Sequence, residues 1–310
     1  MVRAMRRPPL RAALLTLAAL ALSGAPARAD NTGVERTFLE RAAISAADRA
    51  CDLFSDGERH ALASGLYQTE GELLRAGYDS AKVGRLAAEV GAHARSLGCE
   101  HPSVRDVAAT VRDSYGQFQK IGYLEYPAAH GVWAASRSLY DRWAVSQTDA
   151  ASGVMLGLRR PVGASTADDL RLAVALPAGV PAPSAVQIFV RDPRRLAEPW
   201  LGPSHTLKPA ARKLSALAPA PRSMARPEWA SDVVRETDSA GAAIRVFYFP
   251  AAVIARLEAL DPREAIQLEL TPSPRAADKT PVRILFETGD LRAAHHFVLI
   301  PGPTYAPPKK

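Results

Sequence analysis

The sequence predicts an α+β protein, in which an N-terminal disulfide-stapled helical bundle precedes an antiparallel β-sandwich-like domain. Apolar residues recur at helical spacing, between capping residues, from about residue 30 to residue 122. Short runs rich in β-branched and aromatic residues, separated by prolines and glycines, then follow up to residue 300. Both cysteines, Cys51 and Cys99, lie in the helical part, where a bridge between them would act as a staple.

Residues 1–29 have the pattern of a cleavable secretory signal peptide. A basic start without acidic residues precedes the apolar run 12–22, and the small-residue triplet Ala27-Arg28-Ala29 follows it. The run has about 11 residues, whereas a helix that spans a bilayer needs about 20. We therefore expect a mature protein that begins near Asp30, has no transmembrane segment, and is periplasmic or secreted.

The charge of the chain argues against a nucleic-acid partner once this leader is removed. The 39 basic and 32 acidic residues give a net charge of +7, and the leader holds five of the basic residues and none of the acidic ones. The mature balance is therefore +2, and no basic run with interleaved aromatic residues remains. We expect no nucleic-acid binding, and an envelope component or a protein as the partner.

The helical part, 30–122, contains two serine–acid pairs with the spacing of a capping box. Ser45 with Asp48 and Ser55 with Glu58 each place a hydroxyl where it accepts a hydrogen bond from an unpaired backbone N–H. Each pair therefore predicts the start of a helix.

Glycines and a proline divide the rest of this part into further helices. Gly77 and Gly98 follow apolar runs at helical spacing and can form a left-handed C-terminal cap, and Pro102 can open the next helix. Four short helices joined by tight turns predict an antiparallel bundle.

An antiparallel bundle brings the two cysteines to the same pole. Cys51 lies near the end of the first predicted helix and Cys99 lies just past the end of the third. A disulfide between them is within reach, and it would close a loop of 49 residues, which the chain-entropy model values at roughly 4 kcal/mol. Two buried thiols are the alternative.

The β-rich part, 123–300, predicts a two-sheet sandwich or a partly open barrel, interrupted by a short helix at 251–260. The region 192–241 holds seven prolines and is predicted to be a long loop, either functional or poorly ordered. Residues 301–310 are predicted to be a disordered tail. The eight candidate strands are 143–147, 154–159, 170–176, 185–191, 244–249, 265–270, 282–287 and 296–300.

Three stretches of this β-rich part are similar to the invasion-associated locus B family of exported bacterial proteins. They are 143–146 (WAVS), 172–192 (LAVALPAGV leading to VQIFVRD) and 287–294 (ETGDLRAA). The similarity covers about half of the chain, and the cysteines that the family usually carries in its sandwich have no counterpart there. The resemblance implies a small β-sandwich and a role at the envelope or in host contact, with no catalytic residues.

The sequence lacks the motifs of the common enzyme classes. It has no G-x-S-x-G turn for a serine nucleophile, no two histidines four residues apart, and no phosphate-binding glycine-rich loop after a strand. His295 and His296 are neighbours in a predicted strand, so their side chains are expected on opposite faces. We expect no catalytic residues, no cofactor and no metal.

A group of aromatic residues near the boundary of the two parts is the most suggestive local feature. Together with two tryptophans of the predicted loop it forms a possible binding surface. The alternative is that these side chains seal the interface between the bundle and the sandwich and anchor the loop. The residues of the possible binding surface are Tyr126, Trp133, Tyr140, Trp143, Trp200 and Trp229.

We therefore expect an exported, envelope-associated protein that acts as a non-catalytic binding or structural module, with the sandwich and its long loop as the contact surface. The alternative is a hydrolase that acts on an envelope polymer through two loop carboxylates, one as acid and one as base or nucleophile. The carboxylates eligible for this role are Glu125, Asp141, Asp168, Asp169, Glu287 and Asp290.

Overall fold

The computed structural model describes residues 32–164, 166–202, 217–238 and 241–302. It confirms the α+β class, with four helices followed by two antiparallel sheets. The predicted signal peptide and residues 303–310 of the predicted tail lie outside the described residues.

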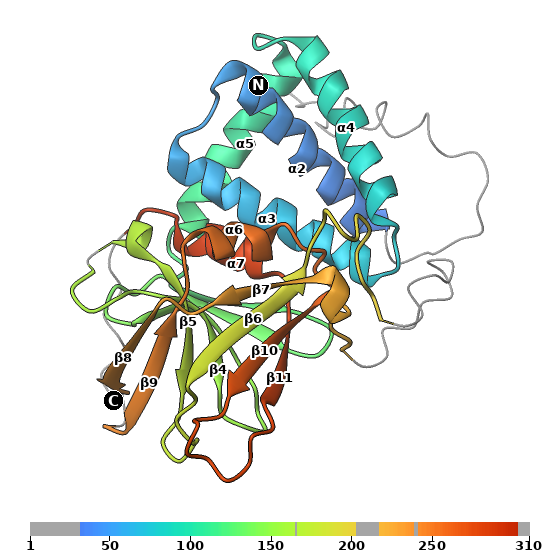
Figure 1. Cartoon of the computed structure of the whole chain (residues 1–310). Helices are drawn as coiled ribbons and strands as arrows, with labels where there is room; N and C mark the ends of the chain where they lie inside the picture. The colour runs from blue at the N-terminus through green and yellow to red at the C-terminus, as the bar shows by residue number, and fades with distance from the viewer. Residues whose placement is uncertain (1–31, 165, 203–216, 239–240, 303–310) are drawn as a thin grey trace, which may run out of the picture.

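The four N-terminal helices lie at one end of the molecule and the sheets at the other, with two C-terminal helices between them (Figure 1). No helix in the described part of the chain is long and apolar enough to cross a membrane. The N-terminal helices are α2 (Thr32–Cys51), α3 (Asp56–Arg75), α4 (Ser80–Leu97) and α5 (Pro102–Phe118), and the C-terminal ones are α6 (Ala252–Glu258) and α7 (Leu291–Val298).

Most of the predicted helix boundaries are confirmed. Ser55 forms the capping box with Glu58 at the start of α3. Gly77 and Gly98 have φ angles of 92° and 81°, which suit glycine because it has no Cβ. Pro102 occupies the first turn of α5, where its missing N–H costs nothing.

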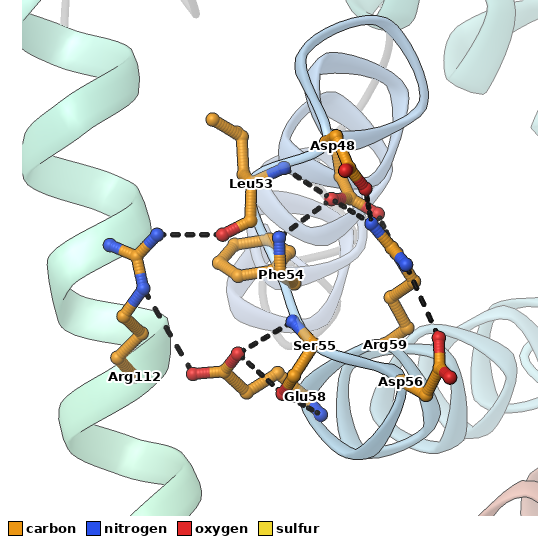
Figure 2. A network of polar contacts seen from close by, with 9 residues as sticks. Asp48, Leu53, Phe54, Ser55, Asp56, Glu58, Arg59 and Arg112 are labelled. Carbon is orange, nitrogen blue, oxygen red and sulfur yellow. Dashed lines mark hydrogen bonds and ion pairs between the residues drawn. The ribbon is translucent and has the colours of Figure 1, made fainter.

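The predicted helix start at Ser45 is wrong, because α2 is already under way and Ser45 lies in its interior. Asp48 caps the following turn instead, as Figure 2 shows. Its buried carboxylate accepts hydrogen bonds from the backbone N–H groups of Leu53 at 2.8 Å and Phe54 at 3.0 Å. Arg59 of α3 donates to the same carboxylate at 2.9 Å, so one side chain fixes the reversal between α2 and α3.

The predicted disulfide between Cys51 and Cys99 is confirmed, with the two Cα atoms 5.5 Å apart. It joins Cys51, the last residue of α2, to Cys99, two residues past the end of α4, as the up-down-up arrangement requires. The bundle is thus covalently closed at one pole.

The larger sheet has seven strands and the smaller sheet has four, and all the strand pairs are antiparallel. In spatial order the larger sheet contains β1 (Tyr123–Pro127), β2 (Val132–Ser136), β3 (Trp143–Thr148), β4 (Met155–Arg159), β5 (Arg171–Leu176), β9 (Ala243–Tyr248) and β8 (Asp232–Thr237). The smaller sheet contains β11 (Val282–Glu287), β10 (Ala265–Thr271), β6 (Ala185–Arg191) and β7 (Ala225–Trp229).

Seven of the eight candidate strands are confirmed, and four further strands were not predicted. β7 and β8 lie within the region 192–241 that was predicted to be a loop, so that prediction is wrong for 225–229 and 232–237. Pro227 is tolerated in β7 because β7 is an edge strand and an edge strand can lack a backbone donor on its open side. β8 is the edge of the other sheet, and its side chains are mostly exposed, which removes the apolar alternation that marks a strand.

One core is shared by both sheets and by α6 and α7. Leu172 of β5, Ile188 of β6 and Phe297 of α7 are fully buried members of it. The predicted strand at 296–300 is wrong, because Leu291, Ala294 and Phe297 repeat at helical spacing and place residues 291–298 in α7. His295 and His296 therefore lie on a helix next to the junction between the two parts.

Candidate functional site

Small residues on one face of α3 allow α7 and the sheets to pack closely against the helical part. A Cβ atom at Gly71 would collide with the carboxylate of Asp290, at the start of α7. Ser64, two turns earlier on the same face, is buried, and its hydroxyl lies 2.9 Å from the hydroxyl of Tyr126 in β1. The sequence of α3 thus makes a buried junction with the β-rich part.

Buried ion pairs and hydrogen bonds hold this junction together. Arg75 at the end of α3 donates two hydrogen bonds to Asp290, at 2.7 and 2.8 Å, and the aspartate side chain is fully buried. Burial raises the pKa of Asp290 to about 6, against the opposing effect of Arg75. Arg263, from the turn before β10, donates to the carbonyl oxygens of Leu74 and Tyr78 at 3.1 and 3.3 Å.

Three histidines gather at the same junction. The Nδ1 atoms of His60 in α3 and His296 in α7 lie 3.0 Å apart, so one ring donates a hydrogen bond and the other accepts it. Burial is the largest cause, and the nearby His60 the second, of the lowered pKa of His296, which is about 4. Burial also lowers the pKa of His60. His295 contacts Glu258 of α6. The described residues contain no group of three or more His, Cys, Asp or Glu side chains placed to hold a metal ion.

Two pockets lie along α3, one in the helical part and one beside the C-terminal helices. The first pocket lies between α2, α3 and α4 and has a volume of about 190 Å³. The second pocket lies between α3, α6 and the start of α7 and has a volume of about 50 Å³. Tyr67 and Glu70 line both pockets, and we call the two pockets together the junction groove.

The two pockets differ in character. The walls of the first are mainly apolar and come from Phe38, Ala42, Leu66, Val83 and Ala87, with Ser45 and Arg49 as polar members. The second is mixed: in addition to the shared pair it is lined by four polar or charged residues, Glu258, Thr288, Asp290 and Arg292, and by Leu260, Pro262, Gly289 and Ala293.

Glu70 stands out among the acidic residues of the groove. It is half-buried and makes no hydrogen bond or ion pair with the described residues. Burial raises the pKa of Glu70, and the positive charge of Arg292 opposes this effect. The guanidinium carbon of Arg292 lies 3.6 Å from the centre of the Tyr67 ring, a cation–π contact that keeps it on the aromatic face.

The other two carboxylates of the second pocket are already engaged. Glu258 contacts His295, and Asp290 accepts both hydrogen bonds from Arg75. Thr288 also lines this pocket, but its hydroxyl oxygen is fully buried and has no hydrogen-bond partner among the described residues. Paired-carboxylate hydrolysis needs two available carboxyl groups. The groove offers one, together with apolar walls, and this arrangement suits binding.

The structure places two of the six residues of the possible binding surface in the core. Tyr126 and Trp133 face each other across β1 and β2 and are 1% and 0% exposed. The indole N–H of Trp133 donates to the carbonyl oxygens of Glu287 and Thr288, at 3.1 and 2.9 Å. Both side chains therefore pack at the junction, and neither is accessible on the surface.

The remaining four residues of that surface are spread over the β-rich part. Tyr140 and Trp229 are exposed. Trp143 is half-buried and lies 5.3 Å from the guanidinium carbon of Arg159, and the half-buried Trp200 donates its backbone N–H to Glu264 at 3.1 Å. No contact between any two of these four aromatic rings is present in the described part of the chain.

The eligible loop carboxylates do not converge on a cleft either. Glu125, Asp141, Asp168 and Asp169 are exposed. Glu287 is 1% exposed, and its two oxygens accept hydrogen bonds from the backbone N–H groups of Ala129 and His130, at 2.8 and 2.7 Å. These contacts give Glu287 a structural role in holding the loop between β1 and β2.

Sequence reasoning missed the residues that line the junction groove. Tyr67 and Glu70 have the pattern of ordinary helix residues. No neighbouring residue in the sequence indicates that another element packs against their face of α3. The one available signal was the helical spacing of residues 291–298, which would have placed Arg292 and the two histidines on a helix.

Comparison of the chain with family models, with curated proteins and with solved structures found no match.

Proposed function

We propose that this protein is an exported, envelope-associated binding module without catalytic activity, and that the junction groove is its ligand site. The observation that carries the proposal is the groove itself, in which the carboxyl group of Glu70, without an ion pair among the described residues, borders a space with mainly apolar walls. Pockets of this kind, with mostly apolar walls and few polar groups, are typical of ligand sites.

Two further features support a location in the periplasm or outside the cell. The Cys51–Cys99 disulfide fits an oxidising compartment, where such bonds persist. The pattern of residues 1–29 is that of a leader for export. The resemblance of the β-rich half to the invasion-associated locus B family points to the same compartment and stays a prediction.

Hydrolysis of an envelope polymer is the second candidate function, because three carboxyl residues line the second pocket. It is the weaker one, since Glu258 and Asp290 are held by His295 and Arg75. If the protein were such a hydrolase, Glu70→Gln would abolish release of soluble fragments from isolated envelope material. The binding proposal predicts that neither wild type nor variant releases any.

Native mass spectrometry of the full-length chain, expressed in the organism that encodes it and purified from the envelope compartment, tests the proposal. We expect a mass that begins near Asp30, lower by two hydrogens than that of the reduced chain, with a population that retains a bound small molecule. Gly84 lines the first pocket, and a Cβ atom there meets no other atom within 4 Å, so Gly84→Leu fills the groove without a backbone clash.

The Gly84→Leu variant should lose the bound mass, whereas Gly116→Leu, in an equally open position on α5, should keep it. An unprocessed leader in the purified protein would contradict export. The absence of any retained mass from wild type, or its equal retention in both variants, would contradict the groove as the ligand site.

A further inference from the structure

The histidine pair of the junction connects the two parts of the protein. The Nδ1 atoms of His60 in α3 and His296 in α7 lie 3.0 Å apart, and both side chains are half-buried. Helix α3 belongs to the helical part, whereas α7 packs into the core that the two sheets share. The ring of Tyr67, two turns further along α3, lies 5.3 Å from the ring of His296. The hydrogen bond between the two histidines therefore ties one end of α7 to the helical part.

This hydrogen bond tolerates one added proton but not two. In the neutral pair, one Nδ1–H donates and the other Nδ1 accepts. A single proton leaves the bond intact, because the charged ring keeps its Nδ1–H and the neutral ring keeps its acceptor. A second proton makes both Nδ1 atoms donors, so that two N–H groups and two positive charges face each other across 3.0 Å. The doubly protonated pair cannot keep this contact.

The surroundings of His296 oppose a positive charge. Burial lowers the pKa of His296 to about 4, and charges on His60, His295 and Arg292 act in the same direction. Glu258 of α6 acts in the opposite direction, but its carboxylate already contacts His295. The closed junction therefore keeps His296 neutral at the pH where a histidine in water takes up a proton.

The surroundings of His60 contain charges of both signs. Burial lowers the pKa of His60, and His295 acts in the same direction. Two carboxylates oppose this effect, Asp56 in the first turn of α3 and Asp168 in the short helix η2 (Ala167–Asp169). Both are exposed, so water and salt screen them. They favour a first proton on His60, whereas the second proton has to enter at the other ring, whose surroundings oppose it.

The opposite end of the contact between α3 and α7 responds to acid in the other direction. There Arg75 donates two hydrogen bonds, at 2.7 and 2.8 Å, to the fully buried side chain of Asp290. Because burial raises the pKa of Asp290 to about 6, its protonation removes a buried charge in the pH range where the histidines gain one. Acid therefore loosens the histidine end of the contact and leaves the other end in place.

We propose that His60 and His296 form an acid-operated latch, which holds the last turn of α7 on α3 at neutral pH and releases it when both rings are protonated. In the released state both histidines reach water and titrate near pH 6.5, so a fall in pH below 6.5 favours release. Helix α7 has only eight residues, and a helix of this length is not stable in water without its packing. Its last turn therefore unravels when the latch opens, while the Cys51–Cys99 disulfide and the two sheets keep the rest folded.

Hydrogen–deuterium exchange of the mature, oxidised protein, followed by NMR at pH 7.5 and pH 5, tests this inference. Each rate is divided by the rate of an unstructured amide at the same pH, which leaves the protection that the fold provides. The backbone N–H of Ile300, which donates to the carbonyl oxygen of Phe297 at 3.3 Å, reports on the latch, as does that of Leu299.

The protection of these two amides should fall at pH 5. The lowered pKa of His296 alone corresponds to about a thirtyfold loss, and partial exposure of the ring reduces this to about fivefold. Protection in the buried strands β4 and β5 should stay unchanged, because the sheets do not depend on the latch.

Glutamine variants separate the pair from either ring alone. A glutamine amide donates or accepts a hydrogen bond and stays neutral, so it preserves the contact and removes the charge. His296→Gln should remove most of the loss of protection, His60→Gln should reduce it, and the double variant should abolish it. The same change at His93, an exposed histidine of α4, is the matched control and should behave as wild type. Circular dichroism at pH 7.5 checks that each variant is folded.

Protection of Leu299 and Ile300 that is the same at pH 7.5 and pH 5 would overturn the inference. So would an undiminished loss in His60→Gln or in the double variant, because the latch requires both rings. An equal loss in β4 and β5 would also overturn it, since the whole protein would then be opening. If a variant does not fold, the position of the loss in wild type still distinguishes local release from global unfolding.

Discussion

Replacement of His296 by glutamine should make the stability of the protein less sensitive to acid. His296 is kept neutral in the folded state, because its pKa is lowered to about 4. Burial is the largest cause, and the neighbouring His60 and His295 add to it. Glu258 opposes this effect, and Arg292 contributes to it. In the unfolded chain the same side chain takes up a proton near pH 6.5. The folded state is therefore favoured above pH 6.5, and this advantage is lost as the pH falls from 6.5 towards 4.

The size of the effect follows from the lowered pKa. Complete loss of this advantage lowers the free energy of unfolding by about 3 kcal/mol, and about 2 kcal/mol of this is already lost at pH 5. Because His296 is partly exposed, solvent screening reduces the expected effect at pH 5 to about 1 kcal/mol. Burial raises the pKa of Glu264 to about 7 and that of Asp290 to about 6. Raised carboxyl pKa values change the stability with pH in the opposite direction, but both groups are present in wild type and variant alike.

Urea unfolding of wild type and His296→Gln at pH 7.5, 6 and 5 measures the difference directly. Between pH 7.5 and pH 5 the difference in unfolding free energy should shift by about 1 kcal/mol in favour of the variant. The same substitution at His93, an exposed histidine of α4, serves as the control and should show no such shift. A difference for His296→Gln that stays constant over this pH range would refute the idea that the junction keeps this histidine uncharged.

Three further predictions concern the stability of the fold, all measured by urea unfolding. Replacing Cys51 and Cys99 by serine should lower the free energy of unfolding by about 4 kcal/mol, because the bridge spans 48 residues; a loss below about 1 kcal/mol would contradict the staple. Arg75→Met should cost about 3 kcal/mol at pH 8 and less near pH 5, where Asp290, with a pKa of about 6, becomes protonated; a cost independent of pH would count against a buried charge. Trp133→Ala should cost about 3 to 5 kcal/mol, as expected of a core tryptophan, and a cost near zero would mean that this side chain is a surface contact.

The sequence predicts the local features of this fold well. The capping box at Ser55, the glycines at 77 and 98 and the placement of the two cysteines are local signals, and the structure contains each of them. Seven of the eleven strands are likewise visible, because their apolar residues reach the core.

Long-range contacts explain what the sequence does not reveal. Strand β7 carries Pro227, and only its place at the edge of a sheet makes that residue acceptable. Helix α7 was mistaken for a strand because a short apolar run fits both periods. The second pocket of the groove is made by α3 and by elements about two hundred residues later in the chain, and no local pattern brings Glu70 near Arg292.

Hydrogen–deuterium exchange of the mature protein tests most directly the claim that the junction groove binds a ligand. The exchange is measured with and without the low-molecular-mass fraction of the envelope of the cells that produce the protein. If the junction groove is the ligand site, slowed exchange is expected in peptides that cover α3 and the start of α7, and no change at the edge strands β7 and β8. Protection confined to the exposed surface around Tyr140 and Trp229, with α3 unaffected, would contradict it.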